Sequence, residues 1–364
     1  MPNTCKVALP MKSTKNMRTP GAIRSTSDLA KRLHLSRWTI SRILNGHSGV
    51  AEETQVRVRK AMAELGFQPN SLARGLRKGT TSIIGICLPE IEGLYLGQKL
   101  EFLRQALTAE GCHVMAGITN GDSQEEAKAL ERFLNLRAAG VISFASHLTA
   151  RTPQVRHFAE AGIPLVFVDP MVAPPKGSVC VDRSTGMHEA LEHLFALGHR
   201  HIATLGIEPG GHYSRERLQS IASAYTTHGW DAGKFVHQAP LPTDGLSPYE
   251  SGRASAEALW NDSPRPTAVL ALNDRVAIGL MDGLRTLGVR VPEDLSLVGY
   301  DNMEVGAFLA PRLTTIDARP DALIAAATER LLQSIRGEEP GGVPAIIPTR
   351  LLVRDSTGPA RKKI

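Results

Sequence analysis

The chain has 364 residues, of which 42% are hydrophobic and 5% aromatic, so it is long enough to fold as two or three globular domains. No apolar run reaches the ~18 residues of a transmembrane helix, which argues against a membrane-spanning protein. Residues 1–80 contain 15 Lys and Arg against 4 Asp and Glu, whereas the remainder contains 27 against 32. This basic head on a mildly acidic body predicts a polyanionic partner at the head, with a solubilising basic tail as the alternative.

The four cysteines are widely spaced and form no C-x-x-C pair, which is typical of reduced thiols rather than of a disulfide framework or a zinc site: Cys5, Cys87, Cys112 and Cys180. Residues 1–24 are basic and contain three prolines, but they lack the continuous apolar segment of a secretory signal. We expect a disordered basic tail there and a cytoplasmic, nucleoid-associated protein. The absence of acidic residues leaves an organelle signal open.

Residues 26–46 predict two short helices joined by a tight turn. Thr26 or Ser27 can cap the first helix, Ser36 can cap the second, and Asn45-Gly46 is a typical helix end. The apolar face of each helix follows helical spacing, with Leu29, Ala30 and Leu33 in the first and Ile40, Ile43 and Leu44 in the second. The outward face of the second helix is cationic, aromatic and hydroxylic, which suits a DNA major groove: Arg37, Trp38, Ser41 and Arg42.

A third helix is expected from about residue 51 to 65, and it completes a small all-α domain over residues 25–69. Val56, Ala63 and the segment 62–65 are expected to pack inward, and Pro69 blocks any continuation. The linker that follows, residues 70–80, has a helical apolar pattern, but Gly75 weakens it by about 1 kcal/mol. A helix this short is marginal alone, so we expect it to order only when something holds it.

From residue 81 the pattern changes to short apolar strands that alternate with amphipathic helices, which predicts parallel, doubly wound sheets. The first half has strands at 82–89, 113–119, 141–146 and 164–169, with helices near 94–110, 123–136 and 152–161. The second half has strands at 179–182, 201–207, 235–240, 267–273 and 295–301, with helices near 184–197, 214–228, 249–260 and 274–287. The fold class is therefore α/β: an all-α helix-turn-helix head and a two-lobed body.

The two lobes are expected to be built from discontinuous segments, because the last helix and strands should cross back to tie the lobes together. We assign residues 81–182 with 312–341 to the first lobe. Residues 183–311 with 342–358 form the second lobe, and 359–364 form a tail.

Several motifs occur in an order that resembles the LacI/GalR (lactose-repressor-like) family of bacterial transcriptional regulators. The head contributes SDLAKRLHLSRWTISRILNG and SGVAEETQVRVRKAMAELGFQPNSLARGLRKG, and the body contributes LEHLFALGHRHIATLG, AVLALNDRVAIGLMDGLRTLGVRVPEDLSLVGYDN and LLVRDST. The resemblance implies a periplasmic-binding-protein-like body and a homodimer that binds a pseudo-palindromic DNA operator. It also implies a small-molecule effector between the lobes, no cofactor and no membrane partner.

The resemblance implies which side chains contact DNA. Arg37 and Trp38 lie where family members read base edges, and an Arg–guanine pair is worth about 1–3 kcal/mol of discrimination. Leu76 matches the linker leucine that wedges between central base pairs, with packing between linkers as the alternative. His34 occupies the turn, where the family often has Gly. The full expected DNA-binding set is Ser27, Ser36, Arg37, Trp38, Thr39, Ser41, Arg42, Asn45, Arg74, Leu76, Arg77 and Lys78.

The expected effector-binding residues are polar and follow strand ends, where clefts of α/β sheets collect them. They are Tyr95, Ser146, Asp169, Asp182, Arg217, Asn273, Asp274 and Asp301. Carboxylate, amide and guanidinium groups suit a sugar or polyol, with or without a phosphate. Asp301 and Arg217 match family pocket positions, His212 and Tyr213 lie in a Gly-rich loop, and a helix cap is the alternative role for Asp274. The segment 93–97 keeps only Tyr95 where the family usually has an aromatic pair.

Catalytic and metal-binding readings have little support in the sequence. His188 and His193 are five apart and therefore do not share a helix face, and no G-x-S-x-G or GxxxxGK[ST] motif is present. The sequence predicts a regulator, most simply a repressor, and not an enzyme. Two alternatives remain: a sugar-binding transport component, and a DNA-binding activator that does not respond to ligand. No leucine heptads follow Ser356, so a tetramer is not expected.

Overall fold

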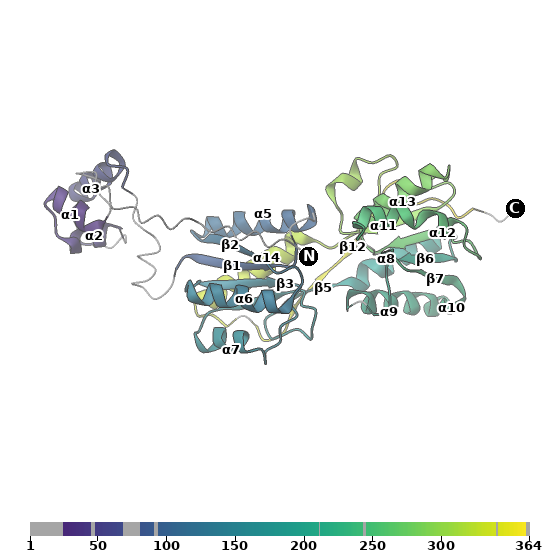
Figure 1. The fold of residues 1–364 in the computed structure, drawn as a ribbon, viewed down its shortest axis with the longest axis horizontal. Helices are drawn as coiled ribbons and strands as arrows, with labels where there is room; N and C mark the ends of the chain where they lie inside the picture. Colours follow the sequence, from purple (N-terminus) through teal and green to yellow (C-terminus); the bar gives the residue numbers. More distant parts are fainter. Residues whose placement is uncertain are drawn as a thin grey trace, which may run out of the picture. The chain divides into compact units, whose positions relative to one another are not determined.

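The computed structural model describes residues 25–44, 48–67, 81–90, 94–210, 212–242, 245–339 and 341–361 (Figure 1). It divides into two compact units, Met1–Gly79 and Thr80–Ile364. The expected tail, the linker 70–80 and Asn45 lie outside the described residues, and with the linker so do Arg74, Leu76, Arg77 and Lys78. Within the described ranges, no helix is long and apolar enough to cross a membrane.

The first unit contains three helices, α1 (Thr26–Leu33), α2 (Arg37–Leu44) and α3 (Glu52–Glu64). Ser25 caps α1, not Thr26 or Ser27 as expected. Its hydroxyl accepts a hydrogen bond from the Asp28 N–H at 3.1 Å, and the Asp28 carboxylate accepts the Ser25 N–H at 3.1 Å. This reciprocal capping box explains why the helix begins at Thr26, at least one residue before the expected start. His34 ends α1 in the left-handed conformation.

The core of the first unit joins the three helices through Leu29, Ala30, Ile40, Ile43, Val58 and Phe67. The expected inner face of α3 is wrong at Val56, which is 59% exposed, and at Ala63 and Leu65, which are also exposed, whereas Met62 packs against this core as expected. Val58 and Ala61 are the buried residues instead. Two valines two positions apart cannot both face the core of a helix, and packing against α1 and α2 selects Val58.

The first lobe of the second unit is built on a six-stranded sheet of order β11-β5-β4-β3-β1-β2, in which every pairing is parallel. Its strands are β1 (Ile83–Leu88), β2 (His113–Ile118), β3 (Gly140–Phe144), β4 (Leu165–Val168), β5 (Val179–Asp182) and β11 (Ala345–Pro348). In register, Ile84 lies opposite Val114 on one side and Gly140 on the other.

Helices cover both faces of this sheet, as doubly wound folds require. One face packs on α5 (Leu94–Ala109) and α14 (Pro320–Ile335), and the other packs on α6 (Ser123–Asn135) and α7 (Pro153–Glu160). Alternate residues of β1 divide between the faces: Ile84 and Ile86 contact the α14 side, whereas Ile83 and Cys87 contact the α6 side.

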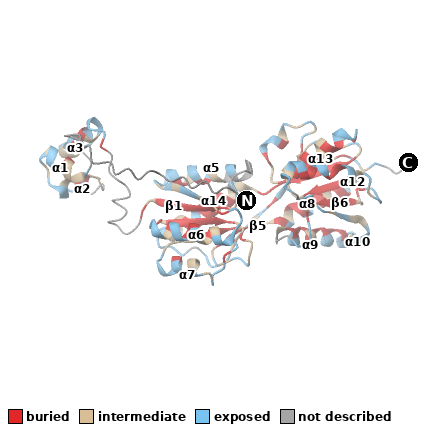
Figure 2. Ribbon diagram, in the orientation of Figure 1, coloured by how far each residue is buried: buried red, intermediate tan, exposed pale blue. Residues whose placement is uncertain are grey.

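The second lobe repeats this architecture on a sheet of order β12-β10-β9-β8-β6-β7, in which only β12 is antiparallel. Its strands are β6 (Ile202–Leu205), β7 (Val236–Ala239), β8 (Ala268–Ala271), β9 (Ser296–Tyr300), β10 (Thr314–Asp317) and β12 (Arg350–Leu352). Buried strands form the centre of each lobe, and exposed residues cover the outer faces of the helices (Figure 2). The expected α/β fold class, with its helical head, is confirmed.

The helices of the second lobe are α8 (Arg183–Ala196) and α9 (His212–Thr227) on one face and α11 (Pro248–Ala254), α12 (Ala256–Trp260) and α13 (Asp274–Thr286) on the other. A short helix α10 (Ala232–Phe235) precedes β7, and a 3-10 turn η1 (Glu304–Ala307) follows β9. The single helix expected at 249–260 is interrupted at Ser255, whose hydroxyl bonds the Ser251 carbonyl at 2.9 Å.

The chain passes between the lobes at three places: from β5 to α8, from β10 to α14, and from β11 to β12. Two expected boundaries are therefore wrong. Residues 314–317 pair with β9 in the second lobe, and residues 345–348 pair with β5 in the first. Apolar patterns identify strands but do not say which sheet edge a strand joins, because that depends on non-local pairing. The three crossings hold the lobes side by side, and a cavity lies between them.

Candidate functional site

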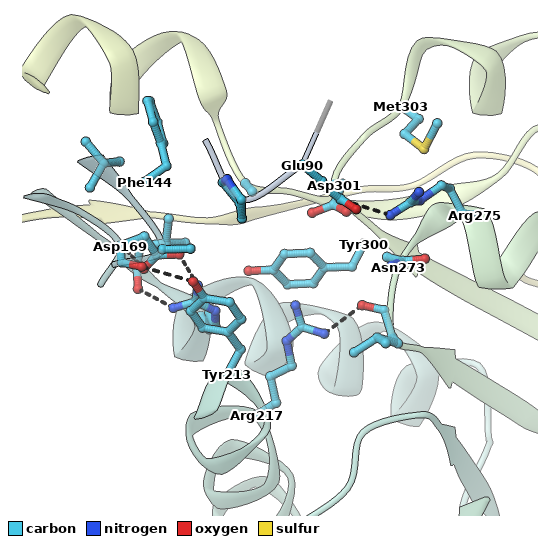
Figure 3. Close-up of a pocket in the computed structure, with 17 residues that line it drawn as sticks. Glu90, Phe144, Asp169, Tyr213, Arg217, Asn273, Arg275, Tyr300, Asp301 and Met303 are labelled. Carbon is cyan, nitrogen blue, oxygen red and sulfur yellow. Dashed lines mark hydrogen bonds and ion pairs between the residues drawn. The ribbon is translucent and has the colours of Figure 1, made fainter. Parts of the chain in front are cut away.

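The cavity of about 300 Å³ lies between the lobes, and strand ends of both sheets supply its walls (Figure 3). Phe144 and Val168 end β3 and β4 of the first lobe, and Tyr300 ends β9 of the second. Residues that follow strands face it from both lobes: Pro89, Glu90, Asp169, Leu272, Asn273 and Asp301. This is the position where open α/β sheets bind ligands.

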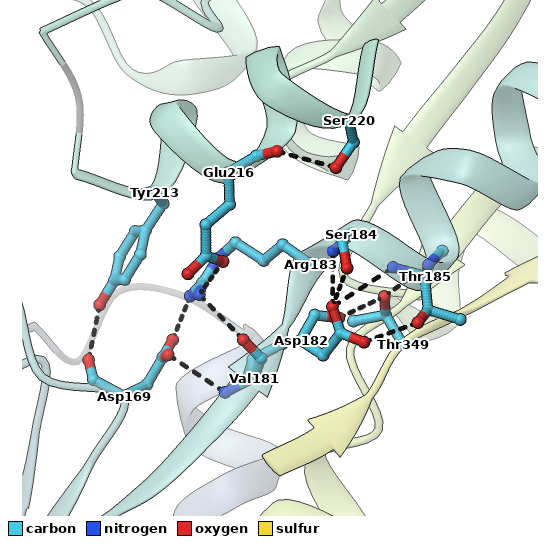
Figure 4. Close-up of polar contacts among 11 residues, drawn as sticks. Asp169, Val181, Asp182, Arg183, Ser184, Thr185, Tyr213, Glu216, Ser220 and Thr349 are labelled. Atoms are coloured by element: carbon cyan, nitrogen blue, oxygen red, sulfur yellow. Dashed lines mark hydrogen bonds and ion pairs between the residues drawn. The ribbon is translucent and has the colours of Figure 1, made fainter. Parts of the chain in front are cut away.

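Arg183 connects the lobes at one end of the cavity (Figure 4). Its guanidinium forms an ion pair with Asp169 of the first lobe and lies 3.6 Å from the Glu216 carboxylate on α9. The guanidinium also lies 4.0 Å from the ring centroid of Tyr213, whose hydroxyl donates to the Asp169 carbonyl at 2.9 Å. Four side chains therefore fix the distance between β4 and α9.

Burial and charge act in opposite directions on Arg183. Burial is the largest single effect and lowers its pKa, but Asp169, Tyr300 and Tyr213 together outweigh burial, and the pKa of Arg183 is raised. Burial raises the pKa of Tyr213, so its hydroxyl keeps its proton at neutral pH and remains a donor. This cluster is a fixed set of charges and donors, not a proton-transfer pair.

Arg217 and Tyr300 form a second pair in the lining of the cavity. The Arg217 guanidinium lies 3.8 Å from the Tyr300 ring centroid and donates from Nη1 to the Leu272 carbonyl at 2.7 Å. Both side chains are buried, and within the described residues the Arg217 Nε and the Tyr300 hydroxyl have no hydrogen-bond partner. In Figure 3 the Tyr300 hydroxyl points toward the Asp169 and Tyr213 side of the cavity.

Arg275, at the start of α13, reaches across the cavity. Its guanidinium lies 3.3 Å from the Glu90 carboxylate, which belongs to the loop after β1. Apolar surface completes the lining through Phe144, Val168, Val181, Met303 and Ala318. A small cavity with apolar walls and a few oriented polar groups suits a small polar organic ligand. Among the described residues, no group of three His, Cys, Asp or Glu side chains is arranged to hold a metal.

Four of the eight expected effector-binding residues line the cavity: Asp169, Arg217, Asn273 and Asp301. Tyr213, named on weaker grounds, lines it too. Asn273 also caps α13, since its side-chain oxygen accepts the Val276 N–H at 3.0 Å. The side chains of Tyr95 and His212 lie outside the described part of the structure.

The structure does not bring Ser146, Asp182 or Asp274 into the cavity, so their expected role there is wrong. Ser146 is buried and its hydroxyl accepts the Leu148 N–H at 3.1 Å. Asp182 caps α8 through the Ser184 and Thr185 N–H groups and faces a separate groove. Asp274 is fully buried and accepts bonds from the Thr315 hydroxyl and the Met303 N–H, both at 2.6 Å.

Sequence reasoning missed four polar residues of the cavity: Glu90, Arg183, Arg275 and Tyr300. Each of the four lies close to a strand end or directly beside a residue that the sequence analysis had named as a candidate. Glu90 follows β1, Arg183 follows Asp182, Arg275 follows Asp274 and Tyr300 precedes Asp301. The strand-end rule could have found Glu90, whereas the others depend on the direction in which each side chain points.

The exposed face of α2 in the first unit carries the expected DNA-reading side chains. Arg37 is exposed and Trp38 is 63% exposed. Ser36 accepts the Thr39 N–H at 2.9 Å, and the two hydroxyls lie 2.8 Å apart, so this pair caps the helix. Ser27 and Thr39 are half-buried, and Ser36 and Ser41 are exposed.

Arg42 is turned back onto the protein. Its guanidinium lies 4.8 Å from the Trp38 ring centroid, and its Nη2 donates to the Ser48 carbonyl. A guanidinium engaged in this way packs against one face of the indole. Arg42 was expected to contact DNA itself. In the structure it packs on the exposed Trp38 ring.

Each of the two units of the chain contains a segment that matches a known protein family. The model of bacterial regulatory proteins of the lacI family matches residues 26–70, and that of the periplasmic binding protein-like domain matches residues 191–357. The transcriptional repressor PurR of Vibrio vulnificus (strain CMCP6) is 28% identical over 330 residues, covering 90% of this chain and 97% of the relative. Catabolite control protein A of Priestia megaterium is 25% identical over 335 residues, with 91% and 98% covered.

Among solved structures, a lac repressor dimer bound to operator and the anti-inducer ONPF matches with a TM-score of 0.78 and 26% identity, covering 92% of this chain and 99% of that one. The chain resembles the LacI family of bacterial regulatory proteins in its head, and regulators of this kind align with most of its length. A complex of the transcriptional regulator CelR with cellobiose also matches, with a TM-score of 0.63 and 26% identity over 90% and 98% of the two chains. The lacI-family match of the head and the periplasmic-binding-protein-like match of the body support a DNA-binding transcription regulator with a ligand-binding body.

Proposed function

We propose that this chain is a LacI-family repressor that binds a pseudo-palindromic operator as a homodimer and is controlled by a sugar-like effector between its lobes. The observation that carries the effector site is the pair of buried, unpartnered polar groups in the cavity, Arg217 Nε and the Tyr300 hydroxyl. A buried polar group without a partner costs about 1–3 kcal/mol, which a bound ligand can recover. The cellobiose bound to the related CelR supports a sugar-like ligand.

The effector would control DNA binding by changing the angle between the two lobes. Tyr213 and Arg275 of the second lobe contact Asp169 and Glu90 of the first beside the cavity, so a ligand there meets side chains that already join the lobes. A ligand that binds one lobe arrangement better than another shifts the population toward it. The lac repressor dimer bound to operator supports both the dimer and the DNA partner.

The DNA contacts are proposed from the head and the linker. Arg37 and Trp38 would read bases, and Arg74, Arg77 and Lys78 would contact phosphates. Leu76 would wedge into the central step, so Leu76→Ala should weaken operator binding well beyond its effect on nonspecific DNA. Equal losses on both DNAs would show that Leu76 does not act as a wedge.

Genomic footprinting with the purified chain tests this function. We expect enriched palindromic sites, and the genes beside them should indicate the effector class. Adding that effector should change occupancy at these sites without changing nonspecific binding. A transport component would bind ligand and give no enriched site, whereas a ligand-independent activator would give sites whose occupancy no ligand changes.

A further inference from the structure

The turn after β9 brings Asp301 and Met303 to the cavity in an uncommon backbone conformation (Figure 3). The φ angle of Asp301 is 105° and that of Asn302 is 54°, so two successive residues that are not glycine lie in the left-handed region. Such a conformation is unfavourable and persists only where the surrounding structure holds it. One contact is with the backbone, since the Asp301 N–H donates to the Ile316 carbonyl of β10 at 2.8 Å.

The next two N–H groups of the turn donate to side chains. The Asn302 N–H donates to the Thr315 hydroxyl at 3.3 Å, and the Met303 N–H donates to the Asp274 carboxylate at 2.6 Å. The Thr315 hydroxyl in turn donates to the other oxygen of Asp274 at 2.6 Å. The two acceptors are therefore bonded to each other, and together they hold two successive residues of the turn.

Asp274 is not needed as a cap for the helix that it begins. Asn273 caps α13 by accepting the Val276 N–H at 3.0 Å, whereas both oxygens of Asp274 accept bonds from outside the helix. The adjacent strand leaves room for this carboxylate, because a Cβ at Gly299 would lie 2.1 Å from Asp274 Oδ1. Asp274 and Thr315 are fully buried, and neither lines the cavity. Their link to the site is therefore the turn itself.

A third side chain holds the turn from the segment that follows β12. Arg354 donates from Nη2 to the side-chain oxygen of Asn302 at 2.6 Å and from Nη1 to the Leu313 carbonyl at 2.8 Å. This segment, α13 and β10 all belong to the second lobe. The turn is therefore fixed to the second lobe and moves with it.

We infer that Asp274 and Thr315 are positioning residues of the effector site, which hold the turn 301–303 in its left-handed conformation and so place Asp301 at the cavity. They do this without contacting a ligand. Burial raises the pKa of Asp274 to about 7, so its charged form is unfavourable at neutral pH, although the charge makes it a stronger acceptor for the turn. The inference rests on the proposed function, since the cavity is the proposed effector site.

Amide hydrogen exchange of the full chain, without ligand or DNA, tests this role at about pH 8, where Asp274 is ionised. Peptides that span 300–303 report on the turn, and urea unfolding reports on global stability. Thr315→Val removes the hydroxyl and keeps the side-chain shape, whereas Thr315→Ser keeps the hydroxyl. Thr204→Val is the matched control, because Thr204 is equally buried in β6 of the same sheet and its hydroxyl has no hydrogen-bond partner among the described residues.

We expect the turn to exchange about tenfold faster in Thr315→Val, because the Asn302 N–H loses its acceptor. Thr315→Ser should restore the exchange rate of the wild type, and Thr204→Val should stay within about twofold of it. A crystal structure of Thr315→Val should show Asp301 outside the left-handed region, with its carboxylate withdrawn from the cavity.

Asp274→Asn separates positioning from stability. Asparagine keeps the shape but is a weaker, uncharged acceptor, so the turn should exchange about three- to tenfold faster. The urea midpoint at this pH should not fall, because the substitution also removes a buried charge that is unfavourable there. A residue that only stabilises the core would not give this combination.

Three results would overturn the inference: exchange of the turn at the wild-type rate in both Thr315→Val and Asp274→Asn, faster exchange that the whole second lobe shares, or an Asp301 that keeps its place in the crystal structure of Thr315→Val. None of these measurements uses a ligand or an operator. Their failure therefore leaves the footprinting result as it is, whereas a chain that finds no operator removes the proposed function whatever the turn does.

Discussion

The guanidinium of Arg275 lies 3.3 Å from the carboxylate of Glu90, and this ion pair joins the first turn of α13 to the loop after β1. The two residues belong to different lobes. Half of the Glu90 side chain is exposed, whereas most of the Arg275 side chain is covered. The pair therefore favours one arrangement of the two lobes. It contributes less to the folding free energy of either lobe.

Glu90→Gln should change effector affinity without changing stability much. Exposed ion pairs contribute about 0.2–1 kcal/mol, so we expect a Kd up to about fivefold weaker and nearly the same Tm. Arg285→Gln is the matched control, because Arg285 pairs with Asp282 at 2.8 Å on the same helix and within one lobe. Calorimetry of both variants checks this prediction. Equal effects of the two substitutions would mean that contact across the cavity is irrelevant to binding.

Asp274 should make stability depend on pH. Burial raises the pKa of this carboxyl from its ordinary 3.8 to about 7, although the Thr315 hydroxyl and Met303 N–H bonds lower it. The folded state therefore binds a proton more tightly than the unfolded state does. The stability that this proton provides is fully present below about pH 4 and is lost as pH rises to about 7.

Urea unfolding of the wild type and Asp274→Asn across this pH range tests the assignment. Each unit of pKa shift corresponds to about 1.4 kcal/mol, so the free-energy difference between the two proteins should change by a few kcal/mol. Asparagine does not titrate, so the variant lacks the stability that the Asp274 proton provides in acid, and its deficit should shrink as pH rises toward 7. A difference that stays constant with pH would rule out titration of Asp274 in this range.

Some residues of the cavity could be predicted from the sequence, and others could not. Asp301 was predicted because it lies in a motif that resembles a known family and follows a strand, and Arg217 was predicted because it matches a family pocket position, although it lies on α9. Arg183 was missed, although it follows a named aspartate, because its role comes from Asp169 and Tyr213, which are 14 and 30 positions away in the chain. Asp274 follows the same strand-end rule as Asn273, but its carboxylate turns toward Thr315 and not toward the cavity.

The fold shows the same division between local and non-local information. Most helices and strands of the body were predicted within a few residues, because apolar periodicity is local. The lobe assignment of β10 and β11 was wrong, because it depends on pairing with β9 and β5. The inner face of α3 was wrong for a related reason, since its rotation is set by α1 and α2.

Arg42 should act on operator choice through Trp38. The guanidinium lies over one face of the indole, 4.8 Å from the ring centroid, and donates to the Ser48 carbonyl, so it restricts the direction of an exposed ring. We expect Trp38→Ala to cost about 1–3 kcal/mol on operator DNA and little on nonspecific DNA. Arg42→Met should reproduce part of this loss, and Arg42→Lys should not restore it, because lysine lacks the planar stacking surface.

Titrations on operator and nonspecific DNA at one salt concentration check this coupling. Arg59→Gln is the control for charge, since Arg59 is an exposed cation on α3 of the same unit. In a double-mutant cycle, Arg42→Met should have little further effect once Trp38 is alanine. Additive losses would instead assign Arg42 a direct DNA contact.

Gly279 should be intolerant of alanine because α11 and α13 approach closely there. A Cβ at Gly279 would lie 1.9 Å from the Tyr249 carbonyl oxygen, and one at Gly252 would lie 2.1 Å from the Val276 oxygen. Both neighbours are backbone atoms, so the helices themselves would have to separate. Overpacking of this kind costs about 1–3 kcal/mol or more.

Because Asn273 and Arg275 at the start of α13 line the cavity, Gly279→Ala should weaken effector binding as well as lower the unfolding free energy. Gly97→Ala is the control, since a Cβ there meets nothing within 4 Å on α5 and should stabilise that helix by about 0.5–1 kcal/mol. Urea unfolding and calorimetry of both variants separate the two effects. If Gly279→Ala lost stability but bound the effector normally, the position of α13 would not control the cavity.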